Sequence, residues 1–347
     1  MRNAIPIVLS ASSVPALAQS AEPIQSYDSY RNWFVACDNT LSCVVKGFDG
    51  DRGGSEMRIE RDAGPAGTLA ATISATDRFA PADVRIDGAP AGLTGPAWSY
   101  SSTQDGTSVT STDLTAIRAL IQKLRNAKTI TLGGDISIPL DGFSAAMLRL
   151  DDRQGRSGGM TALIKPGALP AARVPAAPPV PRIPAHPIQA RLKPGEDTRL
   201  IERVRAEQKA LFEKECSETP QQPEAHALDE ARALVLIPCI MGAYQGSSFA
   251  FIAPRGSGKA ERLIPPLPYR GNDSDPADAA YLTEGGFDPK TGTFSMGARG
   301  RAMADCGMSA SWIWNGRAFQ LSAMSLQQSC GGLGDPGDWP TLFRSRQ

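Results

Sequence analysis

The side chains best suited to chemistry in this 347-residue chain are six cysteines and two histidines. A zinc site needs C-x(2–4)-C pairs with histidines in register, but the closest cysteines here have five residues between them. A redox pair needs C-x-x-C, which the chain lacks. The histidines, His186 and His226, match neither pattern. We therefore predict disulfides, with no metal site and no cofactor. The cysteines are Cys37, Cys43, Cys216, Cys239, Cys306 and Cys330.

The pairing of these cysteines is only partly set by the sequence. Six cysteines allow fifteen pairings. A proline-rich segment divides the chain, and only Cys37 and Cys43 precede it, so these two pair with each other if the two lobes fold independently. The other four leave three alternatives, of which we favour the sequential one. Closing a loop of roughly seven residues stabilises the fold by about 2 to 2.5 kcal/mol, and a loop of about 25 residues by about 3.5 kcal/mol.

Motifs for hydrolysis and phosphate binding are incomplete. The run at 155–159 matches G-x-S-x-G, but a nucleophile elbow needs a strand before it, a helix after it and an acid and then a histidine downstream. Here the next segment reads as a strand, and the downstream histidines lie in the proline-rich segment or just beyond the next predicted helix. The stretch PRGSGKA lacks the first glycine and the Ser/Thr of a phosphate loop. In DSDPADAAYLTE the calcium-loop pattern fails at Ala277 and Asp278. We therefore predict no catalytic residue.

Polar residues beside the cysteines are the remaining candidates for catalysis. Asp38, Asn39 and Asp305 could form a paired acid site, but short polar side chains near bends usually bond their own backbone. A carboxylate-based hydrolase of cell-wall or other glycans is the alternative function, because it needs just two acids about 5 to 10 Å apart. The leading interpretation is a non-enzymatic binding or interaction module, whose partner is an envelope protein or a glycan.

The clearest local signal is SWIWNGRAFQL, which predicts a β-hairpin around Asn315-Gly316. A two-residue type I′ turn would pair Trp314 with Arg317 and place four side chains on one face. They are Trp312, Trp314, Arg317 and Phe319. One interpretation is a core face with the arginine over an indole ring. The other is an aromatic ligand platform, which makes these four the candidate binding residues.

The first 20 residues indicate the compartment. They contain one basic residue, Arg2, and a mostly apolar run that ends in A-x-A at Ala18. The run is interrupted by Pro15 and is shorter than a membrane span needs. We predict a signal peptide cleaved after Ala18, a periplasmic or secreted protein, and no membrane span after cleavage.

The sequence predicts two lobes, which would position the cysteines and the aromatic hairpin. Residues 166–194 hold nine prolines and no apolar periodicity, which predicts an extended tether that proteases cut. It separates an N-terminal β-rich lobe, 21–165, from a C-terminal α+β lobe, 195–347. Both are long enough to bury a core. Thirty-six basic and thirty-six acidic residues give a net charge of zero, which argues against nucleic acid as a partner.

Periodicity gives the elements of each lobe. In the first, YRNWFVAC and CVVKGF read as strands of a disulfide-closed hairpin, and TDLTAIRALIQKLRNA as a helix capped by Asp113. DISIPLDGFSAAMLRLDD and GMTALIKPG read as strands. In the second, EDTRLIERVRAEQKALFEKEC reads as a helix, with ALVLIPC and SSFAFIAP as strands. The fold class is therefore α+β, with two mainly antiparallel β lobes that each contain at least one helix.

Several segments resemble the DUF1176 family of exported bacterial proteins. They are NWFVACDNTLSC, LDDRQGRSGGMTALI, LVLIPCIMGAYQGSS, GRAMADCGMSASWIWNGRAFQL and SCGGLGDPGDWPTL. The resemblance spans nearly the whole chain after the signal. It implies export, and it supplies no catalytic residue, cofactor or substrate.

Overall fold

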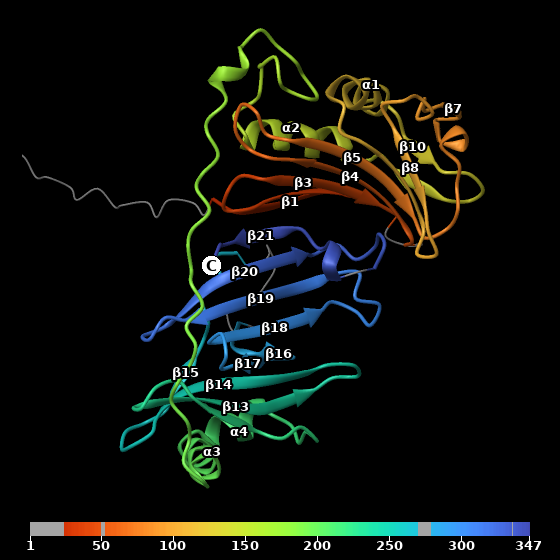
Figure 1. Ribbon diagram of the computed structural model, residues 1–347. Coiled ribbons are helices and arrows are strands. Elements are labelled where there is room, and N and C mark those ends of the chain that lie inside the picture. Colours follow the sequence, from red (N-terminus) through yellow and green to blue (C-terminus); the bar gives the residue numbers. More distant parts are fainter. Residues whose placement is uncertain (1–23, 50–52, 270–278, 335) are drawn as a thin grey trace, which may run out of the picture.

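The computed structural model describes residues 24–49, 53–269, 279–334 and 336–347. The predicted signal peptide and the acidic stretch around Ala277 and Asp278 lie outside the described residues. The architecture is α+β, and the strands of each sheet pair antiparallel (Figure 1). The predicted fold class is thus confirmed.

A seven-stranded sheet forms the first part of the chain, in the order β1-β2-β3-β4-β5-β9-β8. Along β5, buried and half-exposed residues alternate, so one face packs and the other faces outward. A smaller sheet has the order β11-β10-β6-β7. The strands are β1 (Ser26–Tyr30), β2 (Trp33–Cys37), β3 (Cys43–Phe48), β4 (Ser55–Arg61), β5 (Leu69–Ala75), β6 (Arg85–Ile86), β7 (Ala89–Pro90), β8 (Ser99–Ser102), β9 (Thr107–Ser111), β10 (Thr129–Thr131) and β11 (Ser137–Pro139).

Helix α1 (Leu114–Leu124) is the predicted helix, with the predicted cap. The carboxylate of Asp113 accepts a hydrogen bond of 2.7 Å from the N–H of Ala116, which satisfies a free amide of the first turn. The buried side chains recur at helical spacing on one face. They are Ile117, Leu120, Ile121 and Leu124.

Helix α2 (Phe143–Arg153) corrects a prediction. We expected strands over DISIPLDGFSAAMLRLDD and GMTALIKPG, but only β11 in the first is a strand. Gly142, at φ 98°, turns the chain into the helix. The apolar residues that follow have the helical spacing i, i+3, i+4, i+7, which outweighs the β-like run before them. They are Phe143, Ala146, Met147 and Leu150.

The last part of the chain forms two further sheets, in the orders β12-β13-β14-β15 and β17-β18-β19-β20-β21. The predicted helix is present as α3 (Glu196–Glu207) and α4 (Lys209–Glu215). The strands are β12 (Glu224–Ala227), β13 (Arg232–Met241), β14 (Gly246–Pro254), β15 (Glu261–Leu263), β16 (Leu282–Thr283), which pairs with β14, β17 (Gly286–Asp288), β18 (Thr293–Arg299), β19 (Gly307–Trp314), β20 (Phe319–Gln327) and β21 (Thr341–Arg344).

Three buried clusters hold these elements together. The first joins α1 and α2 to one face of the seven-stranded sheet. The third joins α3 to β13 and β14. The middle cluster combines Tyr27, Phe34 and Phe48 from the first sheet with β19 and β20 and with β13. Figure 1 shows the resulting order, from α1 and α2 at the top to α3 and α4 at the bottom.

The proline-rich segment 166–194 runs along these layers in largely extended form (Figure 1). It is held by backbone hydrogen bonds, which include 2.9 Å from the N–H of His186 to Thr291 and 2.8 Å from that of Ile188 to Pro289. The side chain of Ile188 is buried in the middle cluster. The segment therefore packs against the sheets along this part, and its role as a divider between two lobes stays a prediction.

Candidate functional site

The predicted aromatic hairpin is present with a different register. Trp314 pairs with Phe319, not with Arg317, so the loop has four residues and not two. Gly316 has a positive φ of 88°, but Asn315 does not, so the turn is not type I′. The Asn315 side chain instead accepts hydrogen bonds of 2.9 Å from the N–H groups of Arg317 and Ala318. This local bonding closes the longer loop.

The three aromatic side chains of the hairpin are buried. Trp312 is 0%, Trp314 1% and Phe319 4% exposed, and all three belong to the middle cluster. The ring centroids of Trp314 and Phe319 lie 5.2 Å apart. This burial favours the core interpretation over the ligand platform.

The arginine over Trp314 is Arg232, not Arg317. Its guanidinium carbon lies 4.7 Å from the Trp314 ring centroid, and it donates a hydrogen bond of 2.7 Å to the carbonyl of Gly316. Arg317 itself is exposed. The predicted cation–π contact is therefore made by Arg232 of β13 and not by a residue of the hairpin. The sequence pattern alone could not indicate this partner.

The six cysteines form three disulfides in sequential order, Cys37–Cys43, Cys216–Cys239 and Cys306–Cys330. The first closes the turn between β2 and β3. Side chains of that turn bond strand β21 near the C-terminus. The Asn39 side chain donates 3.0 Å to the Arg344 carbonyl and accepts 2.8 Å from the Arg344 N–H. It thereby bonds β21 as a neighbouring strand would.

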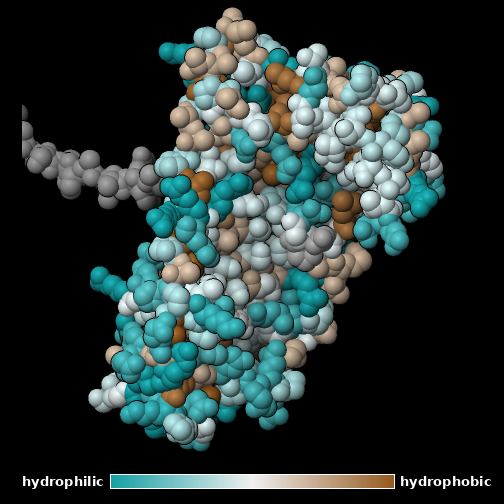
Figure 2. All heavy atoms as spheres, viewed as in Figure 1, coloured by the Kyte–Doolittle hydropathy of each residue, from teal (hydrophilic) through white to brown (hydrophobic). Residues whose placement is uncertain are grey.

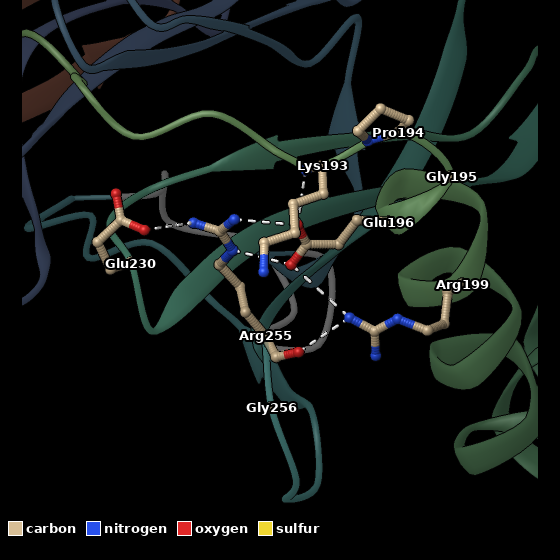
Figure 3. Close-up of a pocket in the computed structure, with 8 residues that line it drawn as sticks. All are labelled: Lys193, Pro194, Gly195, Glu196, Arg199, Glu230, Arg255 and Gly256. Carbon is tan, nitrogen blue, oxygen red and sulfur yellow. Dashed lines mark hydrogen bonds and ion pairs between the residues drawn. The ribbon is translucent and has the colours of Figure 1, made fainter.

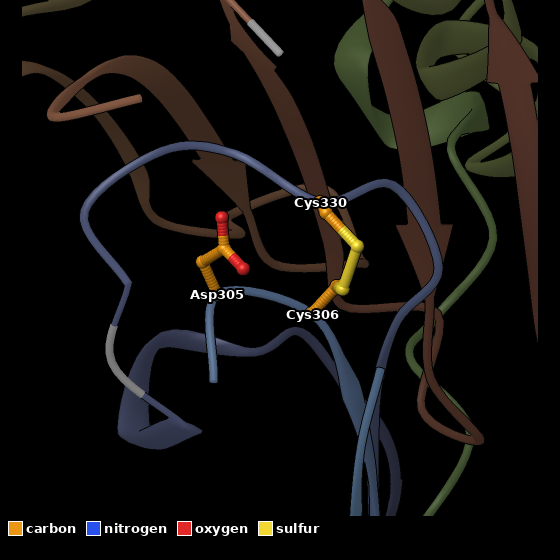
Figure 4. Close-up of side chains that lie close together, drawn as sticks. All are labelled: Asp305, Cys306 and Cys330. Atoms are coloured by element: carbon orange, nitrogen blue, oxygen red, sulfur yellow. A yellow bond between two sulfur atoms is a disulfide. The ribbon is translucent and has the colours of Figure 1, made fainter. Parts of the chain in front are cut away.

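Asp38 and Asp305 also have structural partners. Asp38 is fully buried, accepts hydrogen bonds from Thr40 and Ser42 of its own turn, and pairs with Arg344. Asp305 lies beside the Cys306–Cys330 disulfide (Figure 4) and pairs with Arg301. Hydrogen bonds from Arg301 lower the pKa of the Asp305 carboxyl. The sulfurs are bonded to each other, so this cluster offers no thiolate ligand.

The G-x-S-x-G run is a structural turn. Arg156, 1% exposed, donates hydrogen bonds to the carbonyl groups of Asp62 and Gly64 and to the side chains of Gln154 and Thr161. The run follows α2 and not a strand. It therefore lacks the strand and helix around a nucleophile elbow.

A pocket of about 470 Å³ lies at the start of α3 (Figure 3). Arg255 lies between Glu196, at 2.9 Å, and Glu230, at 3.6 Å. The hydrogen bonds from Arg255 lower the pKa of the Glu196 carboxyl to about 2. Both acids are therefore ion-paired with one arginine, and Glu196 stays ionised over most of the pH range.

A second hollow, which we call the β12 groove, adjoins this pocket and shares Lys193, Pro194 and Gly195 with it. Its volume is about 590 Å³. It is formed by residues 190–195, Asp197, residues 225–227, Pro289 and Lys290. The surface around α3, at the bottom of Figure 2, is mainly hydrophilic. The groove thus joins the end of the proline-rich segment, strand β12 and the turn before β18.

The charge of the β12 groove is mainly positive. Lys193 and Lys290 take part in none of the ion pairs between described residues, and the Arg191 side chain bonds only backbone carbonyls there. Asp197 is the acid that lines the groove. Sequence reasoning missed this site, because its three segments are distant along the chain and none carries a motif.

The family model described as "Protein of unknown function (DUF1176)" matches residues 27–346. The chain is also similar to "Uncharacterized protein YpfG" of Escherichia coli (strain K12), with 31% identity over all of both chains. No solved structure matches it significantly.

Proposed function

Because the chain belongs to the DUF1176 family, whose description names no activity, we propose a function from its geometry. It is an exported, disulfide-stapled binding module without catalysis, and it holds an anionic ligand in the β12 groove. The ligand would belong to an envelope protein or a glycan. The carrying observation is that Lys193 and Lys290 line one groove and take part in none of the ion pairs between described residues.

Export is supported by the cysteines. Three disulfides occupy all six of them, and disulfides persist in oxidising compartments. Among the described residues, no helix combines the length and the apolar character that crossing a membrane requires. The predicted signal peptide is consistent with a periplasmic or secreted location.

The acids that line the hollows support binding over glycan hydrolysis. A general acid for glycoside cleavage needs a raised pKa. The Glu196 carboxyl has a pKa lowered to about 2, and a hydrogen bond from Thr68 lowers that of Asp62, which lines another hollow. Burial raises the pKa of Asp151, but its carboxylate binds the N–H groups of Leu163 and Ile164 inside the first lobe. Asp151 lines none of these hollows and pairs with Arg61 at 3.7 Å.

Binding of acetylated tetraglutamate, measured by NMR titration against tetraglutamine, tests the anion preference. We expect the acidic peptide to bind more tightly, and the double variant Lys193→Gln/Lys290→Gln to weaken it by roughly fivefold or more. The matched control is Lys209→Gln/Lys214→Gln on α4, whose side chains are 75% and 79% exposed. Equal loss in both double variants, or equal binding of both peptides, would contradict the proposal.

A further inference from the structure

We infer that the ligand of the β12 groove is an extended acidic peptide segment, which adds to β12 as the next strand of the sheet. This inference rests on the proposed function and specifies the chemistry and the conformation of the ligand. Three features of the groove carry it: the position of β12 in its sheet, the direction of its backbone groups, and the placement of the two lysines.

β12 is an edge strand. In its sheet it pairs with β13 on one side, and the order β12-β13-β14-β15 gives it no neighbour on the other. Edge strands present unpaired backbone groups that an extended peptide can bond. Residues 225–227 of β12 line the groove. Ala225 and His226 are half-buried and Ala227 is 7% exposed, so the groove reaches the free edge at Ala225 and His226.

The register of β12 and β13 shows which groups are free. The N–H of Leu228 bonds the carbonyl of Arg232 at 2.9 Å, and bonded pairs in an antiparallel ladder recur every second residue. His226 and Leu234 are therefore the next bonded pair. The backbone groups of Ala225 and Ala227 then point away from β13, and they make no hydrogen bond to another described segment. They can bond an added strand.

The segments that carry the two lysines pack on opposite faces of the sheet that contains β12. Lys193 follows Leu192, and Leu192 and Ala225 both pack against the cluster under α3. Lys290 belongs to the turn after Phe287, and the Phe287 ring lies 5.4 Å from the ring of His226, on the other face of β12. Successive side chains of a strand point to opposite faces. Two neighbouring acidic residues would therefore direct their carboxylates to the two faces on which the lysine-bearing segments lie.

The test uses the peptide acetyl-Thr-Glu-Glu-Thr-amide and two versions that are N-methylated on complementary sets of alternate amides. Both versions keep the charges. In a strand, one set of amides faces β12 and the other faces solvent. We expect one version to bind about fivefold more weakly, since it loses backbone hydrogen bonds, and the other to bind nearly as well as the parent peptide.

Hydrogen exchange of the intact protein gives a second measurement. On peptide binding, the amides of Ala225 and Ala227 should exchange more slowly, while that of His226, already bonded to β13, should change little. If both methylated versions bind as the parent does and Ala225 and Ala227 stay unprotected, the strand addition is overturned, while the anionic groove stands. If none of the peptides binds, and tetraglutamate also fails, both proposals are overturned.

Discussion

Two buried side chains show how single residues serve the packing of this protein. Trp314 fills the middle cluster under Arg232, and Glu196 joins the start of α3 to Arg255 on the strand end. One contributes apolar area, and the other contributes an ion pair at the rim of a pocket. Each makes a prediction that a substitution can check.

For Trp314 we expect a structural role. The substitution Trp314→Ala should lower the free energy of unfolding by about 3 to 5 kcal/mol, because it leaves a cavity among buried rings. The control Arg317→Ala removes an exposed side chain and should change stability little. Urea unfolding of both variants measures this. Wild-type stability of Trp314→Ala combined with lost ligand binding would instead restore the aromatic platform.

For Glu196 we expect a pH-dependent contribution to stability. The carboxyl pKa falls from an ordinary 4.5 to about 2 through hydrogen bonds from Arg255. A lowered folded-state pKa means that the contribution is complete above pH 4.5 and is lost as the pH falls toward 2. The difference in stability between wild type and Glu196→Gln should therefore shrink over that range.

The control for this measurement is Glu230→Gln, which alters the other acid at Arg255. The Glu230 side chain is 88% exposed, so water screens its ion pair, and its removal should have little effect at any pH. A stability difference for Glu196→Gln that stays constant from pH 7 to pH 2 would show that the ion pair is not the cause.

The hairpin of β2 and β3 works as a unit with β21. Its disulfide fixes the turn that carries Asp38 and Asn39, and both side chains bind Arg344. The disulfide therefore does more than reduce the entropy of the unfolded chain. It fixes the turn conformation in which Asp38 and Asn39 bond β21.

Removing that disulfide should loosen β21. The variant Cys37→Ala/Cys43→Ala should lose about 2 to 2.5 kcal/mol of stability through chain entropy and should also show faster amide exchange at Arg344. The variant Cys216→Ala/Cys239→Ala should lose about 3.5 kcal/mol without the local change at Arg344. Equal exchange at Arg344 in the two variants, or a non-reduced peptide linking Cys37 to a cysteine other than Cys43, would refute this account.

The whole molecule is joined through its middle cluster. Tyr27, Phe34 and Phe48 of the first sheet pack with β19 and β20, so that separation of the two parts would expose buried rings. A buried ion pair of 2.8 Å between Lys46 and Glu56 lies at the same junction, where Gln327 also bonds Lys46. Separation of residues 24–165 from the rest of the chain would expose these contacts to water.

We therefore expect residues 181–188 to resist limited proteolysis and the chain to unfold in one cooperative transition. The backbone of this stretch bonds Arg346 and Thr291, which keeps it from the extended accessible form that a protease needs. Digestion followed by mass spectrometry measures this, with unfolded protein as the control. Rapid cleavage there into two stable fragments would support the two independent lobes expected from proline content alone.

The sequence by itself determined the features that depend on neighbouring residues. The cap at Asp113, the spacing of α1 and α3, the strands of the first hairpin and the α+β class all follow from local periodicity and side-chain chemistry. Where two local patterns competed, as at Gly142 and Phe143, the prediction of a strand was wrong, because helical spacing and a left-handed glycine outweighed the preceding β-like run.

Only the tertiary structure decided the rest. The hairpin register depends on the packing of Trp314 against Phe319 and Arg232. The β12 groove depends on three segments that are distant along the chain and adjacent in the fold. Such contacts carry no local signature, because their energy comes from burial and charge between residues that are distant along the chain. The presence of Lys193 and Lys290 in one groove therefore could not be predicted from the sequence.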